Sequence, residues 1–495
     1  MNFEAQIGDF RYLVKASEDD CNLSIIPLAG NRRNVESDEI PDSSANSDSS
    51  SSNPVKRKDR GRCIPIIIPR LYIVWAEWSK NSDCGGVKLS YVFGKKASSR
   101  KTIFFKGIDE KEGRLIAESI MEYAYNGSPR AKRLKVLVNP GAGAGNGTLV
   151  KFNSFIMPFF KMANCTVDVE ETSEPSHAIS VCEHLDVSKF DALVVVSGDG
   201  LVFECLSGLA KQSNATRALA IPLAMIPAGS GNALCRSVVG SGSWTLATLH
   251  IIKGKEVPID LSSITFGNER VISFLSQEVG WIADIDIGSE NLRWMGGYRF
   301  AAAFLTRCLL RMSKFPCEIA MKVVESDKTV IQKNSHNIQS SQPTATAVDG
   351  PLPTLKYGDI NSPIPEDWVR VQCPELRNLW AGNMPWMSKD GLFFPASQAG
   401  DGLLDLTILR GKLSRMRALT IMTKAESGDH FDYPEIDYYK VEAYRMIPAE
   451  SIANRFIAFD GEGFPVQPFQ VEVHRGMGRI LSVVGGYQPV AKIMT

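Results

Sequence analysis

The feature that most constrains the fold is a pattern that occurs three times between residues 134 and 232, in which a short apolar run leads into a turn of glycine and small polar residues. The apolar runs are 134–138, 192–196 and 223–226, and a fourth run lies at 166–170. Segments with helical spacing separate them. Buried strands that alternate with helices are typical of a parallel α/β sheet. Because the carboxyl ends of parallel strands lie at one edge, we expect the three turns to meet at a single crevice.

The three turns suit phosphate groups. They read Asn139-Pro140-Gly141-Ala142-Gly143-Ala144-Gly145-Asn146-Gly147, Ser197-Gly198-Asp199-Gly200 and Ala228-Gly229-Ser230-Gly231-Asn232. Glycines let a ligand approach the backbone closely, and N–H groups at the start of the following helices bind anions. The first turn lacks the lysine and hydroxyl of a P-loop, and an aspartate in the second turn has no role in hydride transfer. The sequence therefore predicts a polyphosphate site.

Asp199 is the candidate catalytic residue of this crevice. It ends a run that begins with Val194-Val195-Val196, and it has a glycine on each side. A carboxylate on such a turn can take a proton from an attacking hydroxyl while neighbouring N–H groups hold the charge of the phosphate. We therefore expect phosphoryl chemistry with Asp199 as the general base.

Length and composition predict several segments. At 495 residues, 44% of them hydrophobic, the chain can fill two or more cores. Residues 31–62 are poor in hydrophobic residues and rich in serine, which is typical of disorder. The expected segments are a mostly disordered tail at 1–62, a small β-rich module with a helix at 63–130, an α/β nucleotide-binding catalytic domain at 131–258, and a β-rich domain at 259–488 with a low-complexity surface insertion at 325–368.

Charge and cysteine usage limit the partners. The chain has 55 basic and 55 acidic residues, so we expect no nucleic acid and only local membrane contact. The basic cluster Lys56–Arg60 is either a solvated charge run or a contact for acidic lipid headgroups. Ten scattered cysteines without a C-x-x-C pair indicate a reducing compartment, and we see no secretory, lipidation or membrane-spanning signal. We expect a cytoplasmic protein.

Four motifs in order resemble those of a known superfamily. They are Asn139-Pro140 with the glycines that follow, Ser197-Gly198-Asp199-Gly200 with Glu204, Pro227-Ala228-Gly229-Ser230-Gly231-Asn232, and Asp460-Gly461-Glu462. Over about residues 132–485 the chain resembles the diacylglycerol kinase and sphingosine kinase superfamily. Ser-Gly-Asp-Gly, Pro-Ala-Gly-Ser-Gly-Asn and the stretch from Gly280 through Arg299 are similar to the sphingosine (long-chain base) kinases in particular.

The resemblance implies a fold of class α/β plus all-β, in which a parallel-sheet nucleotide domain, phosphofructokinase- or Rossmann-like, precedes an antiparallel β-sandwich-like lipid-binding domain. It implies an ATP-dependent lipid kinase that uses Mg²⁺ and phosphorylates the primary hydroxyl of sphingosine, dihydrosphingosine or phytosphingosine. Because that substrate is insoluble, it also implies peripheral association with an intracellular membrane such as the endoplasmic reticulum, Golgi, endosome or plasma membrane.

The resemblance also implies the roles of individual residues. Asp199 would take the hydroxyl proton, and Arg293 and Arg299 would offset charge on the transferring phosphoryl group. Glu204, Glu290 and Asp460 would form a supporting acidic set, and the metal ligands stay unknown. The implied nucleotide-binding residues are Asn139, Pro140, Gly141, Gly143, Thr172, Ser197, Gly198, Glu204, Gly229, Ser230, Gly231, Arg293, Arg299, Asp460, Gly461 and Glu462, and the substrate-binding residues are Ser276, Ile282 and Asp286.

Asp286 would decide the substrate. A long-chain base carries a protonated amine that a carboxylate can pair with, whereas diacylglycerol and ceramide carry no such cation. Asp284 lies two residues away and would share a face with Asp286 on a strand, so alternation alone does not choose between them. The family position favours Asp286.

Two alternative functions stay open. One is a diacylglycerol or ceramide kinase, against which Asp286 argues. The other is a catalytically weak nucleotide-binding membrane scaffold. It stays open because several residues depart from those common in the family, namely Ala144, Asn146, Phe203 and Ser207.

Overall fold

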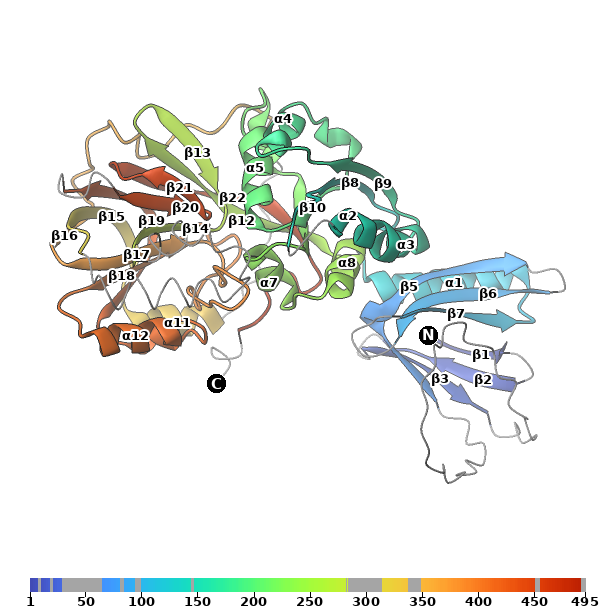
Figure 1. Cartoon of the computed structure of the whole chain (residues 1–495). Coiled ribbons are helices and arrows are strands. Elements are labelled where there is room, and N and C mark those ends of the chain that lie inside the picture. Colours follow the sequence, from blue (N-terminus) through green and yellow to red (C-terminus); the bar gives the residue numbers. More distant parts are fainter. Residues whose placement is uncertain are drawn as a thin grey trace, which may run out of the picture. The chain divides into compact units, whose positions relative to one another are not determined.

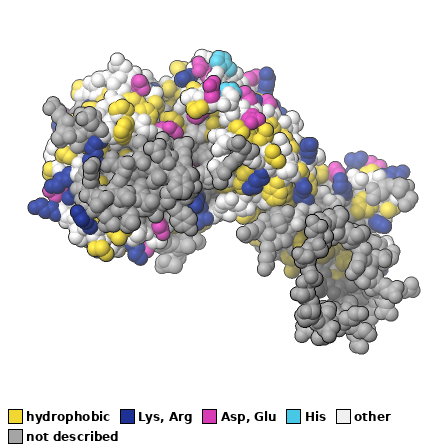
Figure 2. Space-filling model, viewed as in Figure 1, with side chains coloured by type: hydrophobic (Ala, Val, Ile, Leu, Met, Phe, Trp, Pro, Cys, Tyr) yellow, Lys and Arg dark blue, Asp and Glu magenta, His cyan; other side chains and the backbone are white. Residues whose placement is uncertain are grey.

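The computed structural model describes residues 1–7, 10–17, 21–28, 65–80, 84–93, 99–143, 147–281, 283, 314–336, 349–449 and 455–490. The chain divides into two units, Met1–Gly127 and Ser128–Thr495. Among the helices of the described residues, none has the length and apolar content needed to cross a membrane. On the face drawn in Figure 2, basic and acidic side chains both lie at the surface.

The N-terminal unit is a seven-stranded antiparallel sheet with one long helix (Figure 1). Helix α1 (Glu110–Tyr125) begins after Asp109, whose side chain accepts the N–H groups of Lys111 and Glu112, and it packs on β5 and β6. The strands are β1 (Asn2–Ile7), β2 (Phe10–Lys15), β3 (Asn22–Pro27), β4 (Ile66–Pro69), β5 (Ile73–Lys80), β6 (Gly85–Phe93) and β7 (Ser99–Lys106), with the 3₁₀ turn η1 (Arg70–Tyr72) before β5. Their spatial order is β4-β3-β2-β1-β7-β6-β5.

Strands β1, β2 and β3 all lie before residue 28, although we expected 1–62 to be a mostly disordered tail. The low hydrophobic content that predicts disorder belongs only to 31–62, which lies outside the described residues. Before it, apolar side chains alternate with polar ones, as in a strand with one buried face. The buried members are Ala5, Val14, Leu23 and Ile25.

The first half of the second unit contains the parallel sheet that the sequence predicts. Its strands are β8 (Arg133–Val138), β9 (Thr166–Glu171), β10 (Ala192–Ser197) and β11 (Pro222–Pro227), paired in parallel in the order β9-β8-β10-β11. Strands β10 and β11 are buried along their whole length, as expected when helices cover both faces of a sheet. The helical segments are α2 (Thr148–Lys151), the π-helical η3 (Phe152–Ile156), α3 (Met157–Met162), α4 (His177–Glu183), η4 (Val187–Lys189), α5 (Asp199–Leu209), α6 (Ala215–Leu219), α7 (Ala233–Val239) and α8 (Trp244–Lys253).

The second half is dominated by antiparallel strands, which confirms the expected β-sandwich-like class. These strands are β12 (Lys255–Phe266), β13 (Glu269–Ser273), β14 (Ser276–Gly280), β15 (Cys317–Glu325), β16 (Val369–Cys373), β17 (Leu376–Gly382), β18 (Leu404–Arg410), β19 (Ile436–Pro448), β20 (Phe456–Phe459), β21 (Glu462–Pro465) and β22 (Phe469–Ser482). The helical segments are α11 (Lys328–His336), α12 (Arg415–Lys424) and η6 (Asp429–Asp432).

Strand β22 belongs to both halves of this unit. Its early residues pair antiparallel with β19 and β12, and its residues Arg479 and Ile480 pair in parallel with Pro222 and Leu223 of β11. It runs without a break from Phe469 to Ser482. A register irregularity with β12 opposite residues 475–477 marks the point where the one continuous strand changes partners.

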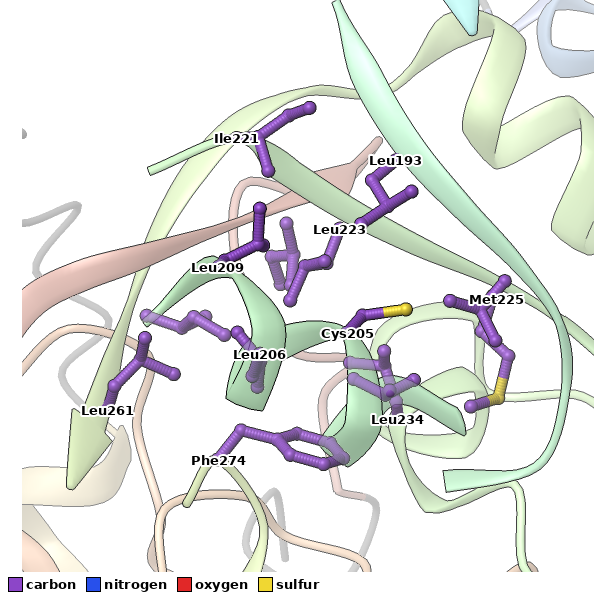
Figure 3. Packing of buried hydrophobic residues seen from close by; sticks show 14 of the residues in the cluster. Leu193, Cys205, Leu206, Leu209, Ile221, Leu223, Met225, Leu234, Leu261 and Phe274 are labelled. Carbon is purple, nitrogen blue, oxygen red and sulfur yellow. The ribbon is translucent and has the colours of Figure 1, made fainter. Parts of the chain in front are cut away.

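A shared hydrophobic core also joins the two halves. It combines side chains from β10, β11, α5 and α7 with side chains from β12 and the chain that follows β13. Figure 3 shows Leu206 of α5 among Leu223 of β11, Leu261 of β12 and Phe274. Each such buried side chain contributes about 1.5–3 kcal/mol by leaving water. Helix α5, which begins at Asp199, is therefore held by both halves.

Residues 349–368, which belong to the surface insertion expected over 325–368, are held by hydrogen bonds to other parts of the chain. Asn214 Nδ2 donates to Asp349 Oδ1 at 3.1 Å, and the N–H groups of Lys356 and Tyr357 donate to the Glu472 carboxylate at 2.8 and 2.9 Å. Polar groups of this segment therefore have partners within the protein. Residues 337–348 lie outside the described residues.

Candidate active site

The three glycine-rich turns leave adjacent strands at one edge of the parallel sheet. Val138 pairs with Val196, and Ser197 pairs with Pro227, so β8, β10 and β11 end side by side. The N–H of Asn139 donates to Val196 O at 3.2 Å, and the N–H of Ala228 donates to Ser197 O at 2.9 Å. The prediction that the turns converge is confirmed.

Glycine is required where the turns touch one another. A Cβ on Gly229 would lie 2.4 Å from Gly198 Cα, and a Cβ on Gly143, which has φ of +79°, would lie 2.8 Å from Ala228 O. At Gly141 the nearest atom would be 3.5 Å away, in the side chain of Asn139. Some of these glycines therefore serve backbone packing, whereas Gly141 is exposed and open to a ligand.

Two side chains fix the shape of the turns. Asn139 Oδ1 accepts the N–H of Gly141 at 2.9 Å. In the third turn, Asn232 Oδ1 accepts the N–H of Gly229 at 3.1 Å, and Asn232 Nδ2 donates to Gly229 O at 2.7 Å. Asn232 has φ of +55°, a region that asparagine tolerates better than most residues. Asn232 is absent from the predicted site residues, although its place in the Ser-Gly-Asn sequence was a signal.

Asp199 connects the second turn to the third. Its carboxylate is 8% exposed, with Oδ2 accepting the N–H of Ala233 at 2.8 Å and Oδ1 accepting the N–H of Leu234 at 3.1 Å. Burial raises the pKa of the Asp199 carboxyl above its usual value, and the N–H groups of Ala233 and Leu234 oppose this rise. A carboxylate with a raised pKa is better matched to removing a proton near neutral pH.

The absence of a side chain at Gly231 leaves room for the Asp199 carboxylate. A Cβ on Gly231 would lie 2.7 Å from Asp199 Oδ2. The N–H groups of Ala233 and Leu234 orient the carboxylate, and the backbone N–H groups of Asn232 and of Asp199 itself also stabilise its charge. Asp199 is thus held in one orientation at the junction of the second and third turns.

Two glutamates of the sequence motifs lie in or beside the segment that begins with the second turn. Glu204 is on α5, and its Oε2 is buried without a hydrogen-bond partner among the residues that the structure describes. Leaving a buried acceptor unpaired costs about 1–3 kcal/mol, so this oxygen points to a donor or cation that the site receives. Glu462 reaches the second turn, since a Cβ on Gly200 would lie 3.2 Å from its Oε1. The Asp460-Gly461-Glu462 motif therefore lies close to the Ser197-Gly198-Asp199-Gly200 turn.

Asp460, predicted with the nucleotide-binding residues, has its carboxylate turned toward the 273–276 backbone. It accepts hydrogen bonds from Ser273 Oγ at 2.7 Å and from the N–H groups of Phe274, Leu275 and Ser276 at 2.9–3.0 Å. Burial raises the pKa of Asp460 to about 6, against the lowering effect of these donors. Asp460 therefore shapes the start of β14, and the adjacent Gly461 has φ of +85°.

The remaining predicted residues divide into three groups. Thr172 and Ser197 are buried at the ends of β9 and β10, and the N–H of Thr172 donates to Val138 O at 2.9 Å. Ser276 is buried, and its hydroxyl donates to Glu278 Oε1 at 3.0 Å. Ser230 is exposed on the third turn, and Pro140 is half-buried on the first. Ile282, Asp284, Asp286, Glu290, Arg293 and Arg299 lie outside the described residues.

Within the described ranges, no group of three or more histidine, cysteine, aspartate or glutamate side chains could hold a metal ion. The shape of the turns is suited to a nucleotide, because Gly141, Gly143 and Ser230 are exposed along one edge of the sheet. Exposed backbone N–H groups in glycine-rich turns are the usual partners of phosphate oxygens.

Comparison with known proteins defines the class first. Residues 133–264 match the family model of the diacylglycerol kinase catalytic domain, and residues 378–482 match that of the YegS C-terminal NAD kinase beta sandwich-like domain. A crystal structure of a Bacillus anthracis protein assigned to the diacylglycerol kinases has the same fold, with a TM-score of 0.50 at 19% identity over 72% of this chain and 97% of that one. The catalytic unit is thus of the diacylglycerol kinase type.

Two relatives show to which family within this class the chain belongs. The chain is 32% identical over 447 residues to sphingoid long chain base kinase 4 of Schizosaccharomyces pombe, covering 88% of this chain and 91% of the relative. It is 31% identical over 359 residues to sphingosine kinase 1 of Arabidopsis thaliana, covering 72% of each. The chain belongs to the family of sphingoid long-chain base kinases, or sphingosine kinases.

The contact between the second and third turns leads to a test of stability. We expect Gly229→Ala to lower the free energy of unfolding by about 1–3 kcal/mol, because the new methyl group would overlap Gly198. Gly242→Ala is the matched control, since a Cβ there meets no atom within 4 Å. Chemical denaturation of both variants measures the difference. Equal stability of the two variants would contradict the close approach of the turns.

Proposed function

We propose that this protein is an ATP-dependent lipid kinase that transfers the γ-phosphoryl group to the primary hydroxyl of a sphingoid base, such as sphingosine, dihydrosphingosine or phytosphingosine. The products are the 1-phosphate and ADP. The observation that carries the proposal is the buried Asp199 carboxylate where the turns after β10 and β11 meet. Membership of the sphingoid long-chain base kinase family supports the substrate class.

In this proposal the turns bind the phosphates and Asp199 handles the proton. The N–H groups of the first and third turns hold the nucleotide at Gly143 and Ser230, and the exposed Gly141, whose own N–H donates to Asn139 Oδ1, lets the phosphates approach closely. Asp199 accepts the proton of the lipid hydroxyl as that oxygen forms its bond to phosphorus and the bond to ADP breaks. Ala233 and Leu234 keep the carboxylate oriented through their N–H groups.

Charge on the phosphates needs compensation. Carboxylate oxygens are the ligands that Mg²⁺ prefers, so Glu204, whose Oε2 has no hydrogen-bond partner among the described residues, would hold such an ion. When bound with ATP, Mg²⁺ neutralises charge on the phosphate oxygens. Arg293 and Arg299 are proposed to add positive charge at the transferring group.

Recognition of the lipid is assigned to the chain that follows β14. Asp286 pairs with the protonated amine of the sphingoid base in this proposal, and Ile282 contacts its apolar part. Ser276 supports this segment through its bond to Glu278 and through the Asp460 carboxylate. Because the substrate is a lipid, the protein works in peripheral contact with a membrane surface.

The catalytic role of Asp199 is testable by a single substitution. We expect Asp199→Asn to lower the rate of sphingosine phosphorylation by about 10²–10⁴-fold, because an amide cannot take the hydroxyl proton. Asp191→Asn is the control, since Asp191 lies before β10 at the opposite end of the sheet, where it binds Arg133. A radiolabelled-ATP assay measures both. A wild-type rate for Asp199→Asn would rule out the mechanism.

The amine-pairing role of Asp286 predicts a selective kinetic change. Asp286→Asn should raise the KM for sphingosine by about tenfold or more while leaving the KM for ATP nearly unchanged, because only the lipid carries the cation. Asp284→Asn, two residues away, should have a smaller effect on both constants. Steady-state kinetics with each substrate varied in turn provide the measurement. Equal effects of Asp286→Asn on the two constants would remove this role.

A further inference from the structure

Two cysteines face each other across paired strands of the β-sandwich-like half. Cys317 begins β15 and Cys373 ends β16, and the two residues are directly opposite in the antiparallel register (Figure 1). Residues opposite each other in such a pair project to the same side of the sheet, with Cβ atoms about 4.5–5.5 Å apart. Cys317 is 5% exposed and Cys373 is 1% exposed, and both belong to one hydrophobic cluster. The two thiols are therefore neighbours in space.

The pair lies at an edge of the sheet. Among the described strands, β16 pairs with β15 alone. Three of its five residues have exposed side chains, namely Val369, Arg370 and Gln372. Both cysteines are terminal residues of their strands, and strand ends at an edge open locally at a lower free energy than the whole fold requires to unfold. A small molecule can therefore reach the two thiols without unfolding of the sheet.

The surroundings favour a thiolate on Cys373. The neighbouring Cys317 thiol lowers the pKa of Cys373 below its usual value, and Arg410 adds to this effect, whereas burial and Asp437 oppose it. The same interaction between the thiols, together with burial, raises the pKa of Cys317. The thiolate is the nucleophilic form of cysteine. Cys373 is thus suited to react first with an oxidant, and Cys317 is placed to attack the product.

A second pair of neighbouring cysteines lacks these features. Cys182 of α4 and Cys205 of α5 are both fully buried in the core that joins the two halves of the unit. The Cys182 thiol and burial raise the pKa of Cys205 well above its usual value. Buried thiols with a raised pKa react slowly. This second pair therefore serves as an internal control for the first.

We propose that Cys317 and Cys373 form a reversible disulfide when the protein meets hydrogen peroxide. The Cys373 thiolate attacks one peroxide oxygen, which forms a sulfenic acid and releases hydroxide, and this hydroxide takes up the proton lost by Cys373. The Cys317 sulfur then attacks the Cys373 sulfur, and the sulfenic oxygen leaves as water with the Cys317 proton. The two thiols lose two electrons in total, which reduce the peroxide to water. In a reducing compartment such a bond is transient.

The bond fixes the edge strand. It closes a covalent loop over residues 317–373, which contains the segment 325–368, and a closed loop restricts the unfolded chain more than the folded one. The two Cβ atoms need to approach by only about 1 Å to reach the spacing of a disulfide. The terminal position of Cys373 in β16 permits this movement. Oxidation therefore locks β16 onto β15.

Peptide mapping of the full chain tests the bond directly. Trypsin places the two cysteines in separate peptides, 315–322 and 371–377, and neither peptide contains another cysteine. After treatment with peroxide and alkylation of the remaining thiols, we expect these peptides to be joined, and to separate again after addition of dithiothreitol. A link between Cys182 and Cys205 should form at least about tenfold more slowly, because those thiols are buried and protonated.

Thermal melting gives a second measurement. Oxidation should raise the Tm of the wild-type protein by about 2–8 °C, and reduction should reverse the rise. Cys373→Ala should abolish both the peptide link and the rise in Tm, whereas Cys182→Ala should retain both. Each variant is compared with its own reduced form, so a variant of lower initial stability still gives a valid result.

Three mapping results would overturn the proposal: no link between the two peptides, an equal rate of linking for Cys182 and Cys205, or oxidation of Cys373 to the sulfinic acid without a disulfide. An unchanged Tm in the linked protein would overturn the locking of β16. No kinase substrate enters these experiments. Their outcome is therefore independent of the proposed phosphorylation of sphingoid bases.

Discussion

The pairing of β22 with strands of both halves is the constraint on which the catalytic unit depends. Arg479 and Ile480 continue the parallel sheet beside β11, while residues 469–473 lie between β12 and β19 in the antiparallel part. The two halves therefore share one sheet and, through α5, one core. This continuity holds the Asp460-Gly461-Glu462 turn, which follows β20, close to the second glycine-rich turn at Gly200.

Within that frame, the glycine-rich turns have two separate physical roles. Gly198, Gly229 and Gly143 allow three backbones to touch, and a side chain at any of them would separate the turns or force its neighbour to shift. Gly141 and Ser230 remain exposed and available to phosphate groups. Asp199 then ties the second turn to α7 through two N–H groups, so the proposed base is oriented by the same contacts that assemble the nucleotide site. Assembly of the turns and orientation of the proposed base thus depend on the same few atoms.

Sequence patterns predicted the parts of this structure that local chemistry determines. Strands β8, β10 and β11 are apolar runs ended by glycine, and both the convergence of their turns and the place of Asp199 followed from that pattern. Strands β1–β3 were missed because the low hydrophobic content of 31–62 was extended to the whole segment before residue 63. The bracing by Asn232, the unpartnered oxygen of Glu204 and the orientation of Asp460 depend on residues distant in sequence, so no local pattern reveals them.

The substrate is the central claim, and one assay tests it most directly. Purified protein would be incubated with labelled ATP and Mg²⁺ against sphingosine, dihydrosphingosine, phytosphingosine, ceramide and diacylglycerol, and the lipid products would be separated by thin-layer chromatography. A carboxylate that pairs with a protonated amine predicts phosphorylation of the three sphingoid bases, with ceramide and diacylglycerol at least about tenfold slower. Equal or faster phosphorylation of diacylglycerol or ceramide, or no labelled lipid at all, would contradict the account.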